Sequence, residues 1–148
     1  MTTDASTAVH EGGCVCGATR YRVEGEPMRV TICHCLWCQR RTGSGFAVEA
    51  VFANKQVAFS GATRSRYRHV SDESGRWLEI EFCPTCATAL GFTLEAAPGI
   101  RAVEAGTFDD PGWISAKRFA FRHVFTRSHR DWSEIPAGAE TYETHFRR

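Results

Sequence analysis

Hydrophobic and polar residues alternate along much of this 148-residue chain, and turn residues interrupt the alternation at short intervals. Alternation with a period of two is typical of strands that bury only one face. The segments that show it are 18–23, 28–33, 46–52, 56–59, 64–67, 76–82, 89–94 and 100–105. No long segment has the helical period, and only residues 36–42 suit a single helical turn. The pattern therefore predicts an all-β domain of many short antiparallel strands.

The two ends of the chain depart from this pattern. Residues 1–10 are mostly small and polar, which predicts a flexible N-terminal tail and leaves residues 11–148 as one domain. Between residues 117 and 130, four arginines are interleaved with three phenylalanines. This favours an edge strand with solvated arginines and buried phenylalanines over a basic groove for an anionic ligand.

Charge and composition exclude several classes of partner. The chain has 18 basic and 17 acidic residues and a formal net charge of +1, so it has no general attraction for nucleic acid or an anionic membrane. No apolar run reaches the roughly 18 residues of a membrane span. The N-terminus lacks the basic start and apolar core of a secretory signal. We therefore expect a cytoplasmic protein with no nucleic-acid and no membrane partner.

Seven cysteines are many for a chain of this length, and they lie in three close groups. The groups are Cys14-x-Cys16, Cys33-x-Cys35-x-x-Cys38 and Cys83-x-x-Cys86. An odd number argues against a disulfide framework, and spacings this short are typical of metal ligands. The seven divide into four and three, which predicts two zinc ions per chain, one in a closed site and one with an open position.

The central group offers three ligands from one short segment. In a strand, Cys33 and Cys35 point to the same face, and the step to Cys38 suits a metal knuckle. Three thiolates leave one position for a substrate, where a fourth thiol can bind and remain nucleophilic. The alternative is a closed four-thiolate site with a cysteine from elsewhere. Arg40 and Arg41 either offset the extra negative charge, receive a substrate carboxylate, or form an ordinary solvated turn.

The remaining four cysteines suit a structural site. Pairing of distant strands brings Cys14 and Cys16 near Cys83 and Cys86, and zinc held by four thiolates is closed to substrates. His34 points away from its cysteine neighbours, so we expect it to be packed or exposed rather than to bind metal. The other histidines show no ligand spacing and receive no role; they are His10, His69, His123, His129 and His145.

Together these motifs resemble the glutathione-dependent formaldehyde-activating enzyme family, which shares its domain with centromere protein V. The matching segments are Gly13-Cys14-x-Cys16-Gly17, Cys33-His34-Cys35-x-x-Cys38-Gln39-Arg40, Phe82-Cys83-x-x-Cys86 and Trp132. The resemblance runs from about residue 12 to about residue 135. It departs from the family at Ala87, where a glycine is usual. If that position has a left-handed backbone, alanine costs about 1 kcal/mol there.

The resemblance implies a zinc-containing all-β fold of the β-tent type, with residues 11–148 as the domain. It implies a structural zinc at Cys14, Cys16, Cys83 and Cys86, and a catalytic zinc at Cys33, Cys35 and Cys38. The implied activity is carbon–sulfur lyase chemistry that forms S-(hydroxymethyl)glutathione from glutathione and formaldehyde or a similar small aldehyde. Arg40 and Arg41 are the candidate glutathione contacts. Two alternatives to this activity stay open: a non-catalytic two-zinc interaction module and a thiol carrier that binds glutathione. Assembly into a homo-oligomer also stays open.

Overall fold

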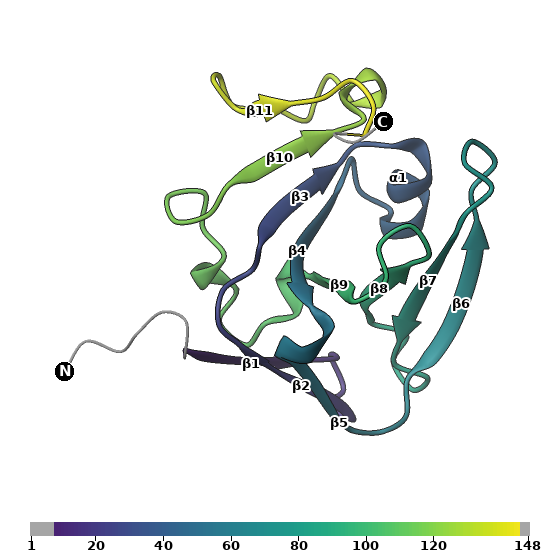
Figure 1. Cartoon of the computed structure of the whole chain (residues 1–148), viewed down its shortest axis with the longest axis vertical. Coiled ribbons are helices and arrows are strands. Elements are labelled where there is room, and N and C mark those ends of the chain that lie inside the picture. The colour runs from purple at the N-terminus through teal and green to yellow at the C-terminus, as the bar shows by residue number, and fades with distance from the viewer. Residues whose placement is uncertain (1–7, 146–148) are drawn as a thin grey trace.

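A computed structural model describes residues 8–145, and most of its regular structure is β-strand (Figure 1). The strands are β1 Val9–Gly13, β2 Thr19–Glu24, β3 Arg29–Cys33, β4 Ala47–Ala53, β5 Val57–Gly61, β6 Ser65–Val70, β7 Trp77–Phe82, β8 Ala89–Leu94, β9 Ile100–Glu104, β10 Phe121–Val124 and β11 Glu140–Thr141. The helix is α1 Leu36–Thr42, and the 3₁₀ helices are η2 Asn54–Gln56, η3 Ala105–Thr107, η4 Pro111–Trp113 and η5 Thr126–Ser128. The predicted strands and the short helix are confirmed to within a few residues.

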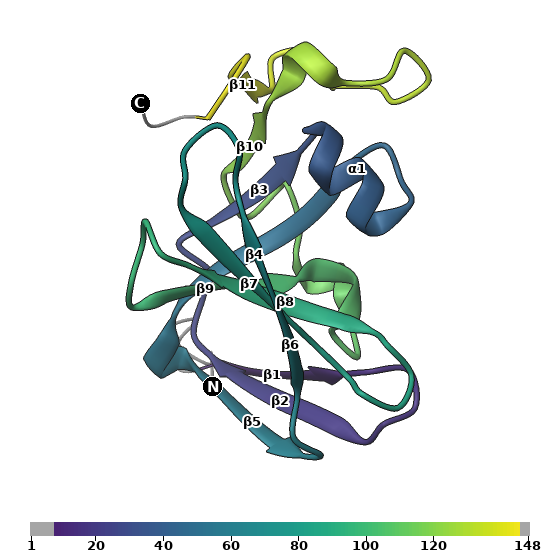
Figure 2. The same ribbon diagram turned by 90° about the vertical axis from the view of Figure 1, so that its right-hand side faces the viewer.

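The strands form two sheets that do not close into a barrel. The small sheet has the order β1-β2-β5, and the large one has the order β11-β10-β3-β4-β9-β8-β7-β6. Figure 2 shows the small sheet, with β1, β2 and β5, below the curved large sheet. The segments between strands begin or end at turn residues, such as Gly25 and Gly61, whose φ angles of 82° and 81° favour glycine.

The main core lies between the two sheets. Tyr21 and Val23 of β2 pack there against Phe52 of β4, Leu90 of β8 and Val103 of β9. Phe108 and Trp113 close one side of it, with ring centroids 5.1 Å apart in an edge-to-face contact. The same cluster includes Cys14 and Cys83, so one group of cysteines lies where the two sheets meet.

The prediction for residues 117–130 is only partly right. Just four of these residues form a strand, β10, and it lies between β3 and β11 rather than at an edge. It runs parallel to both neighbours, so the expectation of purely antiparallel pairing is also wrong there. A long connection through η3 and η4 precedes β10, which allows the parallel direction. The strand ends before Phe125, whose φ of 55° is left-handed.

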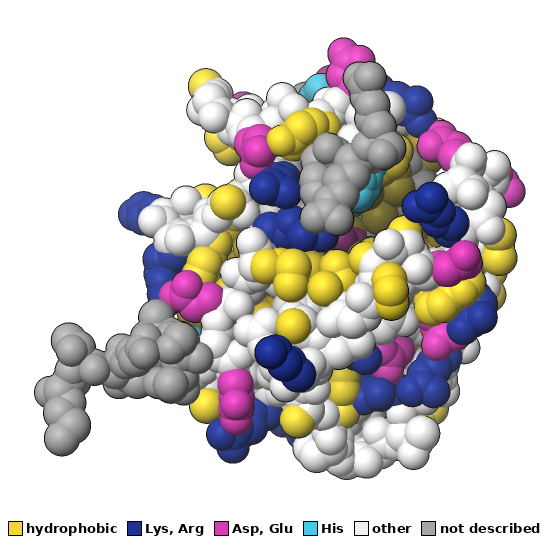
Figure 3. Space-filling view, viewed as in Figure 1, with side chains coloured by type: hydrophobic (Ala, Val, Ile, Leu, Met, Phe, Trp, Pro, Cys, Tyr) yellow, Lys and Arg dark blue, Asp and Glu magenta, His cyan; other side chains and the backbone are white. Residues whose placement is uncertain are grey.

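Paired charges account for three of the four arginines of this segment, and Arg130 donates to the Ser128 carbonyl. Arg118, Arg122 and Arg127 contact Glu26, Glu140 and Glu73 respectively. Basic and acidic side chains are likewise mixed over the face shown in Figure 3, in keeping with the small net charge. The structure therefore gives no support to a basic groove in this part of the chain.

The predicted N-terminal tail can be checked only at its end, because residues 1–7 lie outside the described part of the chain. Val9 and His10, which the prediction includes in the tail, belong to β1 and pair with β2. His10 stacks on Trp113 with ring centroids 3.6 Å apart, which anchors this strand to the core. No helix of residues 8–145 is long and apolar enough to cross a membrane.

Candidate metal centres

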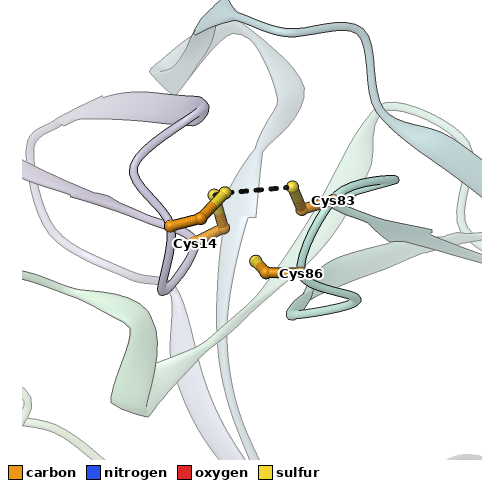
Figure 4. A group of neighbouring side chains, drawn as sticks. Cys14, Cys83 and Cys86 are labelled. Atoms are coloured by element: carbon orange, nitrogen blue, oxygen red, sulfur yellow. Dashed lines mark hydrogen bonds between the residues drawn. The ribbon is translucent and has the colours of Figure 1, made fainter.

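Four cysteines gather where two turns meet. Cys14 and Cys16 lie in the turn between β1 and β2, while Cys83 and Cys86 lie in the turn between β7 and β8. Their sulfur atoms are all within 4.8 Å of one another. The Cys16 sulfur lies 3.6 Å from that of Cys14 and 3.7 Å from that of Cys83. Figure 4 shows Cys14 on one turn facing Cys83 and Cys86 on the other, an arrangement that can hold one metal ion.

The backbone of each turn directs its sulfur atoms inward. The amide N–H of Thr19 donates to the Cys14 sulfur at 3.3 Å, and that of Thr85 donates to the Cys83 sulfur at 3.4 Å. Hydrogen bonds from Thr88 lower the pKa of Cys86 to about 5. Donors that face sulfur stabilise the thiolate, which is the form that binds metal. The cluster therefore has the soft, ionisable ligand set that zinc requires.

Ala87 follows the second turn with a left-handed φ of 63°. Its amide N–H donates to the Cys83 carbonyl at 2.9 Å, which holds the turn closed. Ala87 therefore has the left-handed backbone that a glycine, usual here in the family, adopts without strain. The β-carbon of alanine disfavours this conformation by about 1 kcal/mol.

A second cluster contains three cysteines. Cys33 ends β3, Cys35 is the N-cap residue of α1, and Cys38 lies within the helix. Their sulfur atoms are also within 4.8 Å of one another. No histidine, aspartate, glutamate or further cysteine in the described chain completes this cluster. The predicted division of the cysteines into four and three is thus what the fold produces.

Helix capping explains how this three-cysteine cluster forms. The Cys35 sulfur accepts a hydrogen bond from the Cys38 amide N–H at 3.2 Å, as a capping side chain does at a helix start. The thiols of Cys33 and Cys38 also donate to it and lower the pKa of Cys35 to about 3, while their own pKa values are raised. Hydrogen bonds within the cluster therefore favour a thiolate at Cys35, and the protons of the other thiols leave when a metal binds.

Arg41 lies next to this cluster, and its side chain is buried rather than exposed to solvent. Its side chain is only 7% exposed, with Nη1 2.6 Å from Glu104 and Nη2 3.1 Å from Glu49. Nη2 is also 4.0 Å from the Cys38 sulfur. Burial raises the pKa of both carboxyl groups, and Arg41 lowers both. Of the predicted roles for Arg41, this geometry favours offsetting the charge of the thiolates; Arg40 is exposed on the same helix.

Aromatic contacts tie the helix to the strands beside it. Trp37 stacks on His69 of β6 with ring centroids 4.7 Å apart, and the Arg41 guanidinium lies 5.4 Å from the Trp37 ring. Trp37 therefore packs α1 against β6. Nearby, Arg127 of η5 pairs with Glu73 at 2.7 Å, which joins η5 to the turn between β6 and β7.

His34 is packed, one of the two outcomes that we expect from the sequence, and it has a partner that the sequence does not reveal. Its side chain is 1% exposed, and its Nε2 lies 2.9 Å from Nδ1 of His123, itself 5% exposed. Burial and the neighbouring His123 lower the pKa of His34 to about 4, and burial also lowers that of His123. The pairing arises because β10 runs parallel to β3, which no local signal indicates.

Comparisons with known proteins agree with this picture. The sequence profile of the family described as glutathione-dependent formaldehyde-activating enzyme matches residues 9–128, which leaves Trp132 beyond the match. Comparison with curated proteins gives no match. A crystal structure of a Rhodobacter sphaeroides protein, determined by structural genomics, is similar with a TM-score of 0.54 and 20% identity. The likeness covers 67% of this chain and 87% of that one and bears on the fold alone.

Proposed function

This chain belongs to the glutathione-dependent formaldehyde-activating enzyme family, and on that basis we propose that it is a zinc-dependent carbon–sulfur lyase of that type. It joins a thiol, glutathione, to formaldehyde or a similar small aldehyde, giving S-(hydroxymethyl)glutathione, and it reverses the same step. One carbon–sulfur bond forms, and the carbonyl oxygen takes up the proton that the thiol loses. Atoms balance with no further reactant.

The difference between the two cysteine clusters carries this proposal. Four cysteines form one complete ligand set, whereas Cys33, Cys35 and Cys38 provide three ligands and, within the described chain, no fourth. A site with three protein ligands and a free position is typical of catalytic zinc, and a closed site is typical of structural zinc. All seven cysteines are free thiols, which suits metal binding in a reducing cytoplasm.

Each side chain near the smaller cluster has a proposed role. Cys33, Cys35 and Cys38 hold zinc, which would supply a position where an incoming thiol loses its proton near neutral pH. Arg41, close to the Cys38 sulfur, offsets the negative charge of the three thiolates. Arg40 is exposed on α1 and is the candidate to receive a carboxylate of glutathione.

A second role stays open for the same geometry. A protein that holds zinc in both clusters without accelerating the addition is a non-catalytic interaction module or a glutathione carrier. Thiol binding distinguishes the interaction module from the lyase and the glutathione carrier, because only a free metal position accepts a sulfur atom.

Calorimetric titration of the zinc-loaded protein with glutathione and with S-methylglutathione tests the proposal. The two ligands carry the same carboxylates, but only glutathione has a free thiol. We expect glutathione to bind and S-methylglutathione to bind far more weakly, with glutathione affinity rising as pH approaches the thiol pKa of about 8.5. Cys35→Ser removes the preference. Equal binding of both ligands by the wild-type protein, or no binding of either, contradicts a sulfur-accepting metal position.

A further inference from the structure

A half-open pocket of about 610 Å³ lies beside β3 and β10. Its walls come from these two strands and from the segments 116–120 and 134–140, which lie on either side of it. In Figure 3 the surface is indented between the two lobes that these segments form at the left of the molecule. The volume is within the range of about 300–1,000 Å³ that is usual for small-molecule sites.

The pocket is separate from the three-cysteine cluster. Ile32 and His34 line it, whereas Cys33 packs with Cys38 and Val124 in a different hydrophobic cluster. Residues that alternate along an extended segment point to opposite faces. The sheet therefore separates the pocket from the proposed zinc, and a molecule in the pocket occupies a different site.

The His34 ring lines the pocket and has an unused hydrogen-bonding atom. The distance of 2.9 Å between His34 Nε2 and His123 Nδ1 requires one proton between them, so one ring donates to the other. His34 Nδ1 is buried and has no hydrogen-bond partner in residues 8–145. Buried polar atoms are rarely left unpaired in proteins, and one beside a cavity is a natural contact for a ligand.

The walls and the rim of the pocket indicate the charge of that ligand. Phe46, Phe119 and Phe121 provide aromatic surface, and the described lining contains glutamates but no lysine or arginine. Glu140 accepts hydrogen bonds from Arg122 and Tyr142, which occupy both of its carboxylate oxygens. Glu134 is exposed and makes no ion pair in the described chain. A free carboxylate next to aromatic rings favours a cation.

We propose that this pocket binds a small organic amine with an aromatic or aliphatic body. The body lies against the phenylalanines, a polar group hydrogen-bonds to the His34–His123 pair, and the ammonium group lies near Glu134. This site is independent of the proposed lyase activity. Glutathione suits it poorly, because its two carboxylates outnumber its single ammonium group and would meet the uncompensated Glu134 at the rim.

Tyramine is a suitable probe, because it has an ammonium group at one end of an aromatic ring and a hydroxyl group at the other. Two matched molecules change one end each: phenethylamine lacks the hydroxyl group, and 3-(4-hydroxyphenyl)propionate replaces the ammonium group with a carboxylate. Each is titrated into the zinc-loaded full-length protein by calorimetry. We expect tyramine to bind tightest and the propionate to bind at least about fivefold more weakly, since repulsion replaces one ion pair.

Two variants locate the binding. Glu134→Gln should weaken tyramine binding by about twofold to fivefold, as expected for one solvent-exposed ion pair. It should weaken phenethylamine binding by the same factor, because both molecules carry the ammonium group. Asp72→Asn removes the same charge from an exposed position in the turn between β6 and β7 and should change nothing. Ala120→Leu adds bulk to the pocket wall and should weaken all three molecules without touching the buried histidines.

The proposal is overturned if wild-type protein does not bind tyramine, or if it binds the propionate as tightly. It is also overturned if tyramine binding is unchanged in both Glu134→Gln and Ala120→Leu, since the molecule then binds elsewhere. Folding of each variant is verified by its thermal unfolding transition, and neither position is buried, so both variants should fold.

Discussion

Replacing Arg41 with methionine tests whether this residue supports the three-cysteine cluster from within the protein. The change keeps most of the side-chain volume and removes the charge that lies between Glu49 and Glu104. The side chains of Arg41 and Glu49 are each 7% exposed and that of Glu104 is 14% exposed, so water cannot replace the lost partner. Breaking a buried pair in this way costs about 3–5 kcal/mol of unfolding free energy.

The cost should depend on pH, and its sign follows from the two carboxyl groups. Burial already raises the pKa of Glu49 and of Glu104, and removal of Arg41 raises both further. A carboxyl group with a raised pKa in the folded state stabilises the fold below its unfolded pKa of about 4.3. That stability is lost as the pH rises through the folded-state pKa. The deficit of Arg41→Met is therefore largest near pH 8 and smaller near pH 5.

Urea unfolding of zinc-loaded protein at these two pH values measures the effect. Arg40→Met is the matched control, because Arg40 is exposed on the same helix and should change stability by less than about 0.5 kcal/mol. Comparison of the two variants at each pH also cancels the part of the pH effect on zinc binding that both variants share. A deficit below about 1 kcal/mol for Arg41→Met, or one that is the same at pH 5 and pH 8, would refute the reasoning.

Three further predictions concern the metal sites. Elemental analysis should find two zinc ions per chain, one for each cluster; a single zinc with mapped disulfides would contradict this. Cys83→Ser should unfold the protein or make it insoluble, whereas Cys35→Ser should stay folded by circular dichroism and keep one zinc; equal collapse of both would make both sites structural. Ala87→Gly should raise the unfolding free energy by about 0.5–1 kcal/mol, because it relieves a left-handed φ, while Ala96→Gly should lower it; loss of stability in Ala87→Gly would show that the turn is unstrained.

Much of the fold follows from local signals. Strands such as β8 and β9 are visible as alternating segments between turns, because each buries one face against the core. The three cysteines from Cys33 to Cys38 come together for a local reason, since a strand end and a helix N-cap place them side by side. The left-handed backbone of Ala87 is raised only as a condition and only through the family resemblance, in which a glycine is usual at this position.

Features that depend on distant pairing could not be predicted in this way. The parallel pairing of β10 with β3 brings His123 to His34 across 89 positions, and no spacing in either segment indicates it. Arg41 resembles its exposed neighbour in sequence, and its burial depends on Glu104, which is 63 positions away. Alternation of arginine and phenylalanine between residues 117 and 130 suggested an edge strand, but the later β11 covers that edge.

The rate of adduct formation between glutathione and formaldehyde tests the proposed activity most directly. Thiols add to formaldehyde unaided, so the rate is measured with and without zinc-loaded protein, under otherwise identical conditions. We predict that the wild-type protein raises the rate above this background and that Cys35→Ser, folded and carrying one zinc, does not. Equal rates with and without the wild-type protein would contradict the proposed lyase activity for this pair of substrates.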